Sequence, residues 1–279
     1  MRILLLGASG FVGKHLSAAL RARGDETIDG SLRDPAAAAR SAAQCDAIVN
    51  LAGEPIAQRW NDSVKQRIEA SRVEAPRRFI EALSAVERRC TVYVSASAIG
   101  YYGTSETETF VESSPPGDDF LARVCVGWER EAQKAAQLGM RVAVVRTGVA
   151  LGDDGGALEK MLPPFRAGIG GVVGSGRQWI SWVHIADLAG IYLRAIDSVE
   201  GPLNATAPYP VSNADFTHAL GKALHRPTLL PVPTLALRAM LGEGADMLLQ
   251  GQRVLPQRTQ ELGYRFAFEH LTDALANLL

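Results

Sequence analysis

Three glycines stand three positions apart near the amino end of the chain, in the run Gly7-Ala8-Ser9-Gly10-Phe11-Val12-Gly13. The apolar residues 3–6 precede this run, and apolar residues at helical spacing follow it as far as residue 23. This order predicts a strand, a tight turn and a helix. Small residues let a backbone approach a pyrophosphate closely, and the free N–H groups at the start of a helix attract anions. The run therefore predicts a site for the phosphates of a dinucleotide.

The second predicted strand ends in the segment Ile28-Asp29-Gly30-Ser31-Leu32-Arg33. In a dinucleotide site, an acidic residue at this place holds the adenosine ribose, whereas an arginine suits a ribose that carries a 2′-phosphate. Asp29 comes slightly early and is expected within the strand, while Ser31 and Arg33 come where the strand should end. The sequence therefore favours NADP over NAD as the cofactor.

Strands and helices alternate through the first half of the chain. After the strand at residues 3–6, strands are predicted at 26–29, 47–51, 91–95 and 141–146, with helices at 11–23, 35–44, 64–86 and 121–138 between them. Pro76 is expected to interrupt the third helix. Such alternation predicts parallel βαβ units with right-handed crossovers. We therefore expect an α/β fold with a doubly wound, Rossmann-type parallel sheet, which binds ligands at the carboxyl ends of its strands.

The regular alternation of predicted strands and helices ends at residue 152. Residues 153–176 are rich in glycine, and prolines are spread through residues 208–279. Strands are predicted at 179–184 and 203–206, on either side of a helix at 185–196. We therefore predict that residues 1–152, resumed at about 177–207, form the dinucleotide-binding domain, and that residues 153–176 and 208–279 form a smaller mixed domain for the substrate.

The composition excludes several classes of protein. The chain has 279 residues, and 29 Lys+Arg against 30 Asp+Glu leave a formal net charge of -1, which argues against a basic face for nucleic acid or anionic lipid. Its three cysteines, Cys45, Cys90 and Cys125, form no Cys-x-x-Cys pair and fit a reducing compartment. No metal-ligand spacing, signal peptide or transmembrane run is apparent. The cytoplasm is the expected location, and no metal is expected.

Several motifs in combination resemble a known family. These are the glycine run, Asn50-Leu51-Ala52-Gly53-Glu54-Pro55-Ile56, Arg59-Trp60, Ser71-Arg72-Val73, Ser95-Ala96-Ser97-Ala98-Ile99-Gly100-Tyr101-Tyr102-Gly103, Trp182-Val183-His184-Ile185-Ala186-Asp187 and Leu249-Gln250-Gly251-Gln252-Arg253-Val254-Leu255-Pro256. The chain resembles an extended or atypical short-chain dehydrogenase/reductase of the epimerase/dehydratase kind. More narrowly, it is similar to the YfcH-like epimerase-family proteins with their characteristic C-terminal domain. The resemblance covers nearly the whole chain.

This resemblance implies a cofactor site built from the turns after five strands. It places Gly7, Ser9, Gly10, Phe11, Val12 and Gly13 at the pyrophosphate, Ser31 and Arg33 at the adenosine end, Leu51, Ala52, Gly53 and Glu54 beside the nucleotide, Ser95 and Ala96 nearest the nicotinamide, and Thr147, Gly148 and Val149 after the next strand at the same edge. It defines neither the substrate nor the direction of hydride transfer, and it allows a homodimer.

One expected catalytic pair is missing from the sequence. Dehydrogenases of this superfamily use a serine together with Tyr-x-x-x-Lys on a helix, where the lysine lowers the pKa of the tyrosine. No tyrosine here has a lysine four residues later. On the helix where the pair should occur, Cys125 and Glu129 lie four apart on one face. A neighbouring carboxylate raises the pKa of a thiol, so this pair does not reproduce the missing one. Glu129 as an acid or base, Cys125 as a buried filler, and both as cofactor contacts stay open.

Other residues are candidates for proton transfer or substrate binding. Ser97, near the end of the fourth predicted strand, is a catalytic candidate that would act through a hydrogen bond. Tyr101 and Tyr102 follow it, and each is read either as a proton donor or as a ring packed against the loop. Arg59 and Trp60 are candidates for substrate contact, since arginine clamps anions and indoles stack on rings. Trp179 and Trp182 could line the same substrate cavity, but such tryptophans more often belong to the core. His184 and Asp187 fit a structural role better than a catalytic one.

Two functions remain open at this point. The first is an NADP-dependent oxidoreductase or epimerase-like enzyme that acts on a small molecule. The second is a sensor or partner-binding protein of the same fold that binds NADP(H) without turnover, which the missing tyrosine and lysine favour. Cofactor binding alone does not separate these functions.

Overall fold

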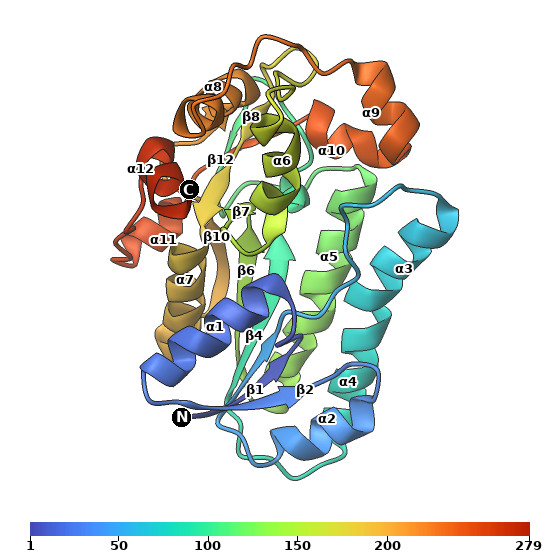
Figure 1. Ribbon diagram of the computed structural model, residues 1–279. Helices are drawn as coiled ribbons and strands as arrows, with labels where there is room; N and C mark the ends of the chain where they lie inside the picture. The colour runs from blue at the N-terminus through green and yellow to red at the C-terminus, as the bar shows by residue number, and fades with distance from the viewer.

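The computed structural model describes all 279 residues, and its centre is a six-stranded sheet (Figure 1). The strands lie in the order β10-β6-β4-β3-β1-β2, and every neighbouring pair is parallel. Their bounds are β1 (Arg2–Leu6), β2 (Glu26–Gly30), β3 (Ala47–Asn50), β4 (Val92–Ala98), β6 (Arg141–Thr147) and β10 (Gly201–Ala205). The predicted α/β fold with a parallel Rossmann-type sheet is confirmed.

Alternate side chains of β1 feed the two apolar layers that cover the sheet. Ile3 and Leu5 pack in the layer that includes α1 (Phe11–Ala22) and α7 (Ile185–Ser198). Leu4 and Leu6 pack in the opposite layer, with α2 (Pro35–Ala42) and α4 (Glu74–Ser84). A strand that is buried on both faces needs apolar residues at every position. This explains the uninterrupted apolar run at residues 3–6.

Two of the predicted helices are divided differently from the expectation. The predicted helix at 64–86 is two helices, α3 (Asp62–Arg72) and α4, and the break falls at Val73 rather than at Pro76. Pro76 lies in the first turn of α4, where a missing N–H group leaves no helical hydrogen bond unmade. The predicted helix at 121–138 is α5 (Phe120–Gln133) followed by a 3₁₀ turn at Lys134–Leu138.

The predicted strand at 179–184 does not join the central sheet. It is divided into β8 (Trp179–Ile180), which pairs antiparallel with β11 (Val211–Ser212), and β9 (Trp182–His184), which pairs parallel with β7 (Val149–Leu151). Ser181 separates them, and its hydroxyl bonds to the backbone of Gln252 and Val254. This anchor holds the segment against the C-terminal part of the chain. The strand predicted at 203–206 is β10, which does join the sheet beside β6.

Most of the remaining elements lie above the sheet in the view of Figure 1, and one short helix, Gln257–Glu261, lies beside β10. The remaining elements are α6 (Gly156–Arg166), α8 (Asn213–Ala223), α9 (Thr234–Leu241), α10 (Asp246–Leu249), α11 (Gln257–Glu261), α12 (Leu271–Leu278), the paired strands β5 (Thr109–Phe110) and β12 (Arg253–Val254), and 3₁₀ turns at Ile99–Tyr102 and Glu243–Ala245. Trp182, Phe216 and Leu275 belong to an apolar cluster in this part. None of the helices has the length and apolarity needed to cross a membrane. The predicted domain boundaries stay a prediction.

Candidate functional site

A cavity of about 510 Å³ opens at the carboxyl ends of β1, β2 and β3. It is lined by residues 7–10, 29–33 and 51–55, together with Ser71 and Ala75. In the sheet, β1 lies between β2 and β3, so the chain leaves β1 toward one side and later returns to the other. Ligands of open α/β sheets bind at such a reversal of strand order. The three turns predicted from the sequence thus meet around one cavity.

Glycine is required at both ends of the first turn. Gly7 has a φ of +88°, and a Cβ there would approach Leu51 C and Ala52 N to 3.0 Å. A Cβ on Gly13 would lie 2.3 Å from the carbonyl oxygen of Gly7. Gly10 is the N-cap of α1, no side chain caps this helix, and its first turn has no acidic residue. The N–H groups at the start of α1 are therefore left free for an anion.

The second turn presents one cation and one anion to the cavity. Asp29, Ser31 and Arg33 all line it, and both Asp29 and Arg33 are exposed. The backbone N–H of Arg33 donates to Ser31 Oγ at 3.2 Å, and the Arg33 guanidinium has no ion-pair partner. This arrangement leaves the guanidinium free to meet a phosphate.

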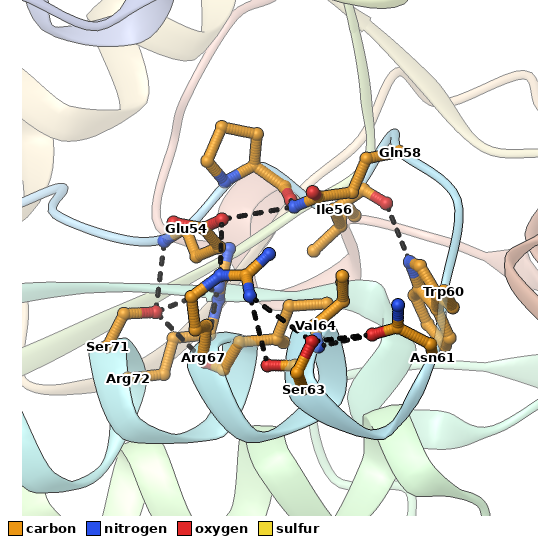
Figure 2. A network of polar contacts seen from close by, with 12 residues as sticks. Glu54, Ile56, Gln58, Trp60, Asn61, Ser63, Val64, Arg67, Ser71 and Arg72 are labelled. Carbon is orange, nitrogen blue, oxygen red and sulfur yellow. Dashed lines mark hydrogen bonds and ion pairs between the residues drawn. The ribbon is translucent and has the colours of Figure 1, made fainter.

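The third turn is held by polar contacts to α3, which Figure 2 shows. The backbone N–H of Glu54 donates to Ser71 Oγ at 2.9 Å, while the Glu54 carboxylate accepts from Gln58 Nε2 at 3.2 Å and from Arg67 Nε at 3.3 Å. The hydrogen bond from Gln58 and the contact with Arg67 lower the pKa of Glu54. Inside the turn, Asn50 Oδ1 accepts from the N–H of Ala52. These bonds fix the backbone of residues 51–54 beside the cavity.

Eight of the residues that the resemblance assigned to the cofactor do not line this cavity. They are Phe11, Val12, Gly13, Ser95, Ala96, Thr147, Gly148 and Val149. The ring of Phe11 fills the space beside Gly152, Gly155 and Gly156, where any Cβ would collide with it. Ser95 is fully buried within β4, and its hydroxyl donates to Ala96 O. The roles of these eight residues stay a prediction.

A buried polar cluster joins β4, α5 and β6. Ser97 Oγ donates to Glu129 Oε1 at 2.7 Å. Arg146 binds the same carboxylate with two N–H groups, at 2.8 Å from Nε to Oε1 and 2.8 Å from Nη2 to Oε2. Burial opposes the charge of Arg146, but its bond to Glu129 raises the pKa of the guanidinium. Glu129 therefore pairs with Arg146 and orients the Ser97 hydroxyl.

Cys125 lies beside this cluster as an intact thiol. Its side chain is buried, and Ser97 is among the groups that influence its titration. Burial and the negative charge of Glu129 raise the pKa of Cys125 to about 12. The thiol therefore stays protonated at neutral pH and is a poor nucleophile or base. Sequence reasoning anticipated the direction of the carboxylate's effect.

The two neighbouring tyrosines differ in how their hydroxyls are used. The hydroxyl of Tyr102 donates to Asn204 Oδ1 at 2.7 Å and accepts from Arg146 Nη1 at 2.9 Å. Burial raises the pKa of Tyr102 to about 12, and both of its hydrogen bonds join it to buried groups of the fold. The half-buried ring of Tyr101 covers the guanidinium of Arg146, whose Cζ lies 3.5 Å from the ring centroid. None of the side-chain hydrogen bonds of the protein involves the Tyr101 hydroxyl.

A second cavity, of about 170 Å³, lies where α5 begins. Trp60 and Phe120 line it, and their rings pack edge to face with centroids 5.5 Å apart. Leu121 also lines it and lies next to Gly100. Trp60 Nε1 donates to Ile56 O. Arg59, predicted as its partner in substrate binding, is exposed and does not line this cavity. The short segment 51–60 contributes to both cavities, because residues 51–55 line the first and Trp60 lines the second.

The motif around His184 has the structural role that the sequence favoured. His184 Nδ1 accepts from the N–H of Ala186 at the start of α7, and its ring stacks on Phe268. The carboxylate of Asp187 accepts from the N–H groups of Ala267 and Phe268. The indole N–H of Trp182 donates to Tyr209 O inside the core. The contacts of His184 and Asp187 hold α7 against the C-terminal segment, while the buried Nε2 of His184 has no hydrogen-bond partner.

Sequence reasoning missed Arg146 and Arg72. Arg146 occupies an interior position of the apolar run in β6, and a charged residue at such a position was a signal that its side chain needs a buried partner. Arg72 was noted within a family motif and assigned no role. Its guanidinium lies behind Gly53, at 3.0 Å from the position of a Cβ there. That placement depends on tertiary structure and had no signal in the local sequence.

Comparisons with known proteins bear on both parts of the chain. Residues 3–207 match the NAD dependent epimerase/dehydratase family, and residues 232–278 match a domain of unknown function, DUF1731. The human epimerase family protein SDR39U1 is 39% identical, and the match covers 100% of each chain.

Solved structures give the same picture. A crystal structure of human epimerase family protein SDR39U1 (isoform2) with NADPH matches with a TM-score of 0.92 at 38% identity, over 100% of this chain and 99% of that chain. The UDP-glucose 4-epimerase of Thermus thermophilus, in complex with NAD, has a TM-score of 0.82 at 18% identity, over 100% of this chain and 97% of that chain. The second likeness concerns the fold alone.

Proposed function

Because the chain belongs to the NAD-dependent epimerase/dehydratase family, as its motifs predicted, we propose that it binds NADP(H) and acts as an oxidoreductase or epimerase-like enzyme on a small molecule. The observation that carries this proposal is the cavity between β1, β2 and β3, where the uncapped start of α1 meets two glycine-containing turns. The free main-chain N–H groups at the start of α1, beside the turn at Gly7–Gly10, would hold the diphosphate. The cavity has the size range of a small-molecule site.

The choice of NADP over NAD rests on the second turn. Arg33 lines the cavity without an ion-pair partner, and Ser31 stands beside it with a hydroxyl. Both would bind the 2′-phosphate of the adenosine ribose, whereas Asp29 would repel it. The NADPH bound by the human relative in its crystal structure supports the same choice. Arg33 is therefore the residue on which the preference depends.

The chemistry is proposed for the region of Ser97 and Tyr101. Bound NADP(H) supplies a hydride acceptor or donor through its nicotinamide. The Ser97 hydroxyl donates a hydrogen bond to Glu129. The lone pairs of Ser97 Oγ are therefore left to accept a hydrogen bond from a substrate hydroxyl. The Tyr101 hydroxyl, with its ring supported by Arg146, would give or take the proton. Glu129 and Arg146 are then positioning residues, and Cys125 is a packing residue.

We propose that the second cavity holds the part of the substrate remote from the reacting atoms. Its Leu121 lies one helical turn before Cys125 on α5, and Trp60 and Phe120 give it apolar ring surfaces. Trp60 is the member of the predicted Arg59-Trp60 pair that would contact substrate. Cytoplasmic location and a homodimer stay predictions.

A sensor without turnover remains the second candidate function. One specific observation favours it: at the expected positions of the tyrosine and lysine, the chain has a protonated thiol and a carboxylate bound to Arg146. Neither group can take over the roles of the missing pair. In a sensor, the same cavity would bind NADP(H), and the C-terminal part would meet a partner instead of a substrate.

Calorimetric titration with NADPH and NADH tests the cofactor proposal. The parent protein should bind NADPH more tightly, and Arg33→Ala should remove most of the preference while changing NADH affinity little, because NADH has no 2′-phosphate. Equal affinities in the parent protein would refute the choice of NADP.

A metabolite panel followed by NADPH absorbance tests turnover. With an active substrate, Tyr101→Phe should lower kcat by about 10²- to 10⁴-fold, which is the range for loss of a general acid or base. Cys125→Ala should retain activity. Absence of turnover across carbonyl compounds and sugar nucleotides would favour the sensor.

A further inference from the structure

The segment at residues 234–249, which contains α9, a 3₁₀ turn and α10, buries little of its own surface. Leu237 is the one buried residue of α9, and α10 has no buried residue. Leu235 and Met240, also on α9, are 81% and 69% exposed. A segment with few buried apolar side chains opens at a lower free energy than the core of the same protein. The contacts that hold this segment therefore decide how often it opens.

The same segment forms part of the wall of the second cavity. Glu243, Asp246 and Met247 line that cavity together with Trp60. Met247 also packs against the small apolar cluster that contains Trp60. A movement of the segment therefore changes the shape of the cavity that is proposed to hold part of the substrate.

Trp60 meets the segment through its backbone and through its ring. The N–H of Trp60 donates to Leu241 O at 3.0 Å. A Cβ at Gly242 would lie 2.8 Å from the carbonyl oxygen of Trp60, and a Cβ at Gly244 would lie 3.0 Å from Cδ1 of its ring. The two glycines thus let the backbone of the segment lie directly against Trp60.

Trp60 is also tied to the third turn of the first cavity (Figure 2). Its Nε1 donates to Ile56 O at 2.8 Å, and Gln58 Nε2 donates to the Glu54 carboxylate at 3.2 Å. Glu54 itself lines the first cavity. A continuous set of contacts therefore runs from the first cavity, through residues 54–60, to the segment that borders the second cavity.

We propose that residues 234–249 form a lid on the second cavity and that Trp60 couples the opening of this lid to occupancy of the first cavity. The inference rests on the proposed function, because it requires NADP(H) in the first cavity. A ligand that orders residues 51–55 also restricts the chain that holds Trp60, so the free energy needed to open the lid rises. Because such coupling is reciprocal, a substrate that holds the lid closed strengthens the binding of the coenzyme.

Hydrogen exchange followed by mass spectrometry, with NADPH as the probe, measures the opening of the lid. Without NADPH, the N–H groups of residues 234–249 should exchange at least about 100-fold faster than those of α8, which buries Phe216 and Leu220. Saturating NADPH should slow exchange in the lid by about 5- to 50-fold, within the usual range of coupling between two sites. Exchange in α8 should not change.

Gly244→Ala tests whether the coupling passes through Trp60. The added Cβ would push the lid away from the ring, and Gly244 lines neither cavity. In this variant the lid should exchange faster, and NADPH should no longer protect it. The affinity for NADPH should fall by no more than the protection that is lost, because the coupling is reciprocal. Ala239→Ser is the matched control, since Ala239 is exposed on α9 of the same lid; it should change neither exchange nor affinity.

A second substitution keeps the test independent of one variant's folding. Lys65→Gln removes the ion pair between Lys65 on α3 and Glu243 on the lid. It should also speed exchange in the lid, although by less than Gly244→Ala, because the pair is partly exposed. Thermal unfolding of each variant checks that it is folded.

Two results would overturn the inference while leaving the proposed function intact. The first is NADPH that binds and protects residues 51–55 but leaves exchange in the lid unchanged. The second is a lid that, without NADPH, exchanges as slowly as α8. If calorimetry detected no binding of NADPH or NADH, the proposed function would fail and the inference with it.

Discussion

Replacement of Glu129 by glutamine should destabilise the protein through the charge that it leaves behind on Arg146. The side chains of Arg146 and Glu129 are 5% and 15% exposed, and two N–H groups bind the two carboxylate oxygens. Removal of one partner of a buried ion pair costs about 3 to 5 kcal/mol, because the remaining charge is left without compensation. With an unfolding entropy of about 2.1 cal/mol/K per residue, this corresponds to a fall in Tm of about 5 to 8 °C.

A double-mutant cycle measures the interaction itself. Urea unfolding would be followed for the parent, Glu129→Gln, Arg146→Met and the double variant. The double variant should be more stable than the sum of the single losses implies, by up to about 3 kcal/mol, since no buried charge remains. Glu81→Gln is the control, because Glu81 is exposed and lies 3.9 Å from Arg77; it should change stability by less than about 1 kcal/mol. Small, additive effects at Glu129 and Arg146 would refute the buried pair.

Three other outcomes follow from the structure. Gly13→Ala should lower the free energy of unfolding by about 1 to 3 kcal/mol and weaken NADPH binding, because the added Cβ at position 13 would lie 2.3 Å from the carbonyl oxygen of Gly7. Unaltered urea unfolding and unaltered coenzyme titration would contradict this interpretation of the turn. Trp60→Ala should lower the free energy of unfolding by about 3 to 5 kcal/mol, since Trp60 is only 8% exposed. A loss below about 1 kcal/mol would mean that Trp60 contributes little to the packing of the core. The free energy of unfolding should fall as the pH rises from about 9 toward 12, because the thiol of Cys125 ionises near pH 9.0 in the unfolded chain while burial raises its pKa in the folded protein to about 12. Iodoacetamide should leave this thiol unlabelled at about pH 8 until urea is added. Rapid labelling of the folded protein, detected by mass spectrometry, would contradict the burial of Cys125.

The parts of the fold that the sequence predicts well are those encoded locally. The glycine run is tied to one backbone geometry, because Gly7 needs a positive φ and Gly13 admits no Cβ. The apolar run at residues 3–6 fits only a strand buried on both faces. The break between α3 and α4 was placed at Pro76 because proline disrupts helix interiors, but a first-turn proline is compatible with a helix.

The parts that the sequence did not predict depend on contacts between distant segments. Cys125 and Glu129 were identified from their helical spacing, but the partner that fixes the role of Glu129 is Arg146, on the next strand of the sheet. Spacing along one helix contains no information on a residue that faces it from β6. The same holds for Trp179 and Trp182, which belong to two short strands with different partners.

The contacts between the C-terminal part and the rest of the chain were predicted least completely. Strands of two residues, such as β5 and β12, are too short to leave a periodic signal. Glu112 was not noticed either, although its carboxylate accepts from the N–H groups of Asn204, Arg258 and Thr259 and so joins the loop before α5 to β10 and α11. Glu112 follows the apolar Phe110 and Val111 and precedes two serines, and this local sequence does not indicate the partners that bury its carboxylate.

A crystal structure of this protein grown with NADPH tests the central claim most directly. The account predicts the diphosphate at the turn of residues 7–10 and the start of α1, and the 2′-phosphate within hydrogen-bonding distance of the Arg33 guanidinium. NADPH bound elsewhere, or an adenosine phosphate turned away from Arg33 toward solvent, would contradict it.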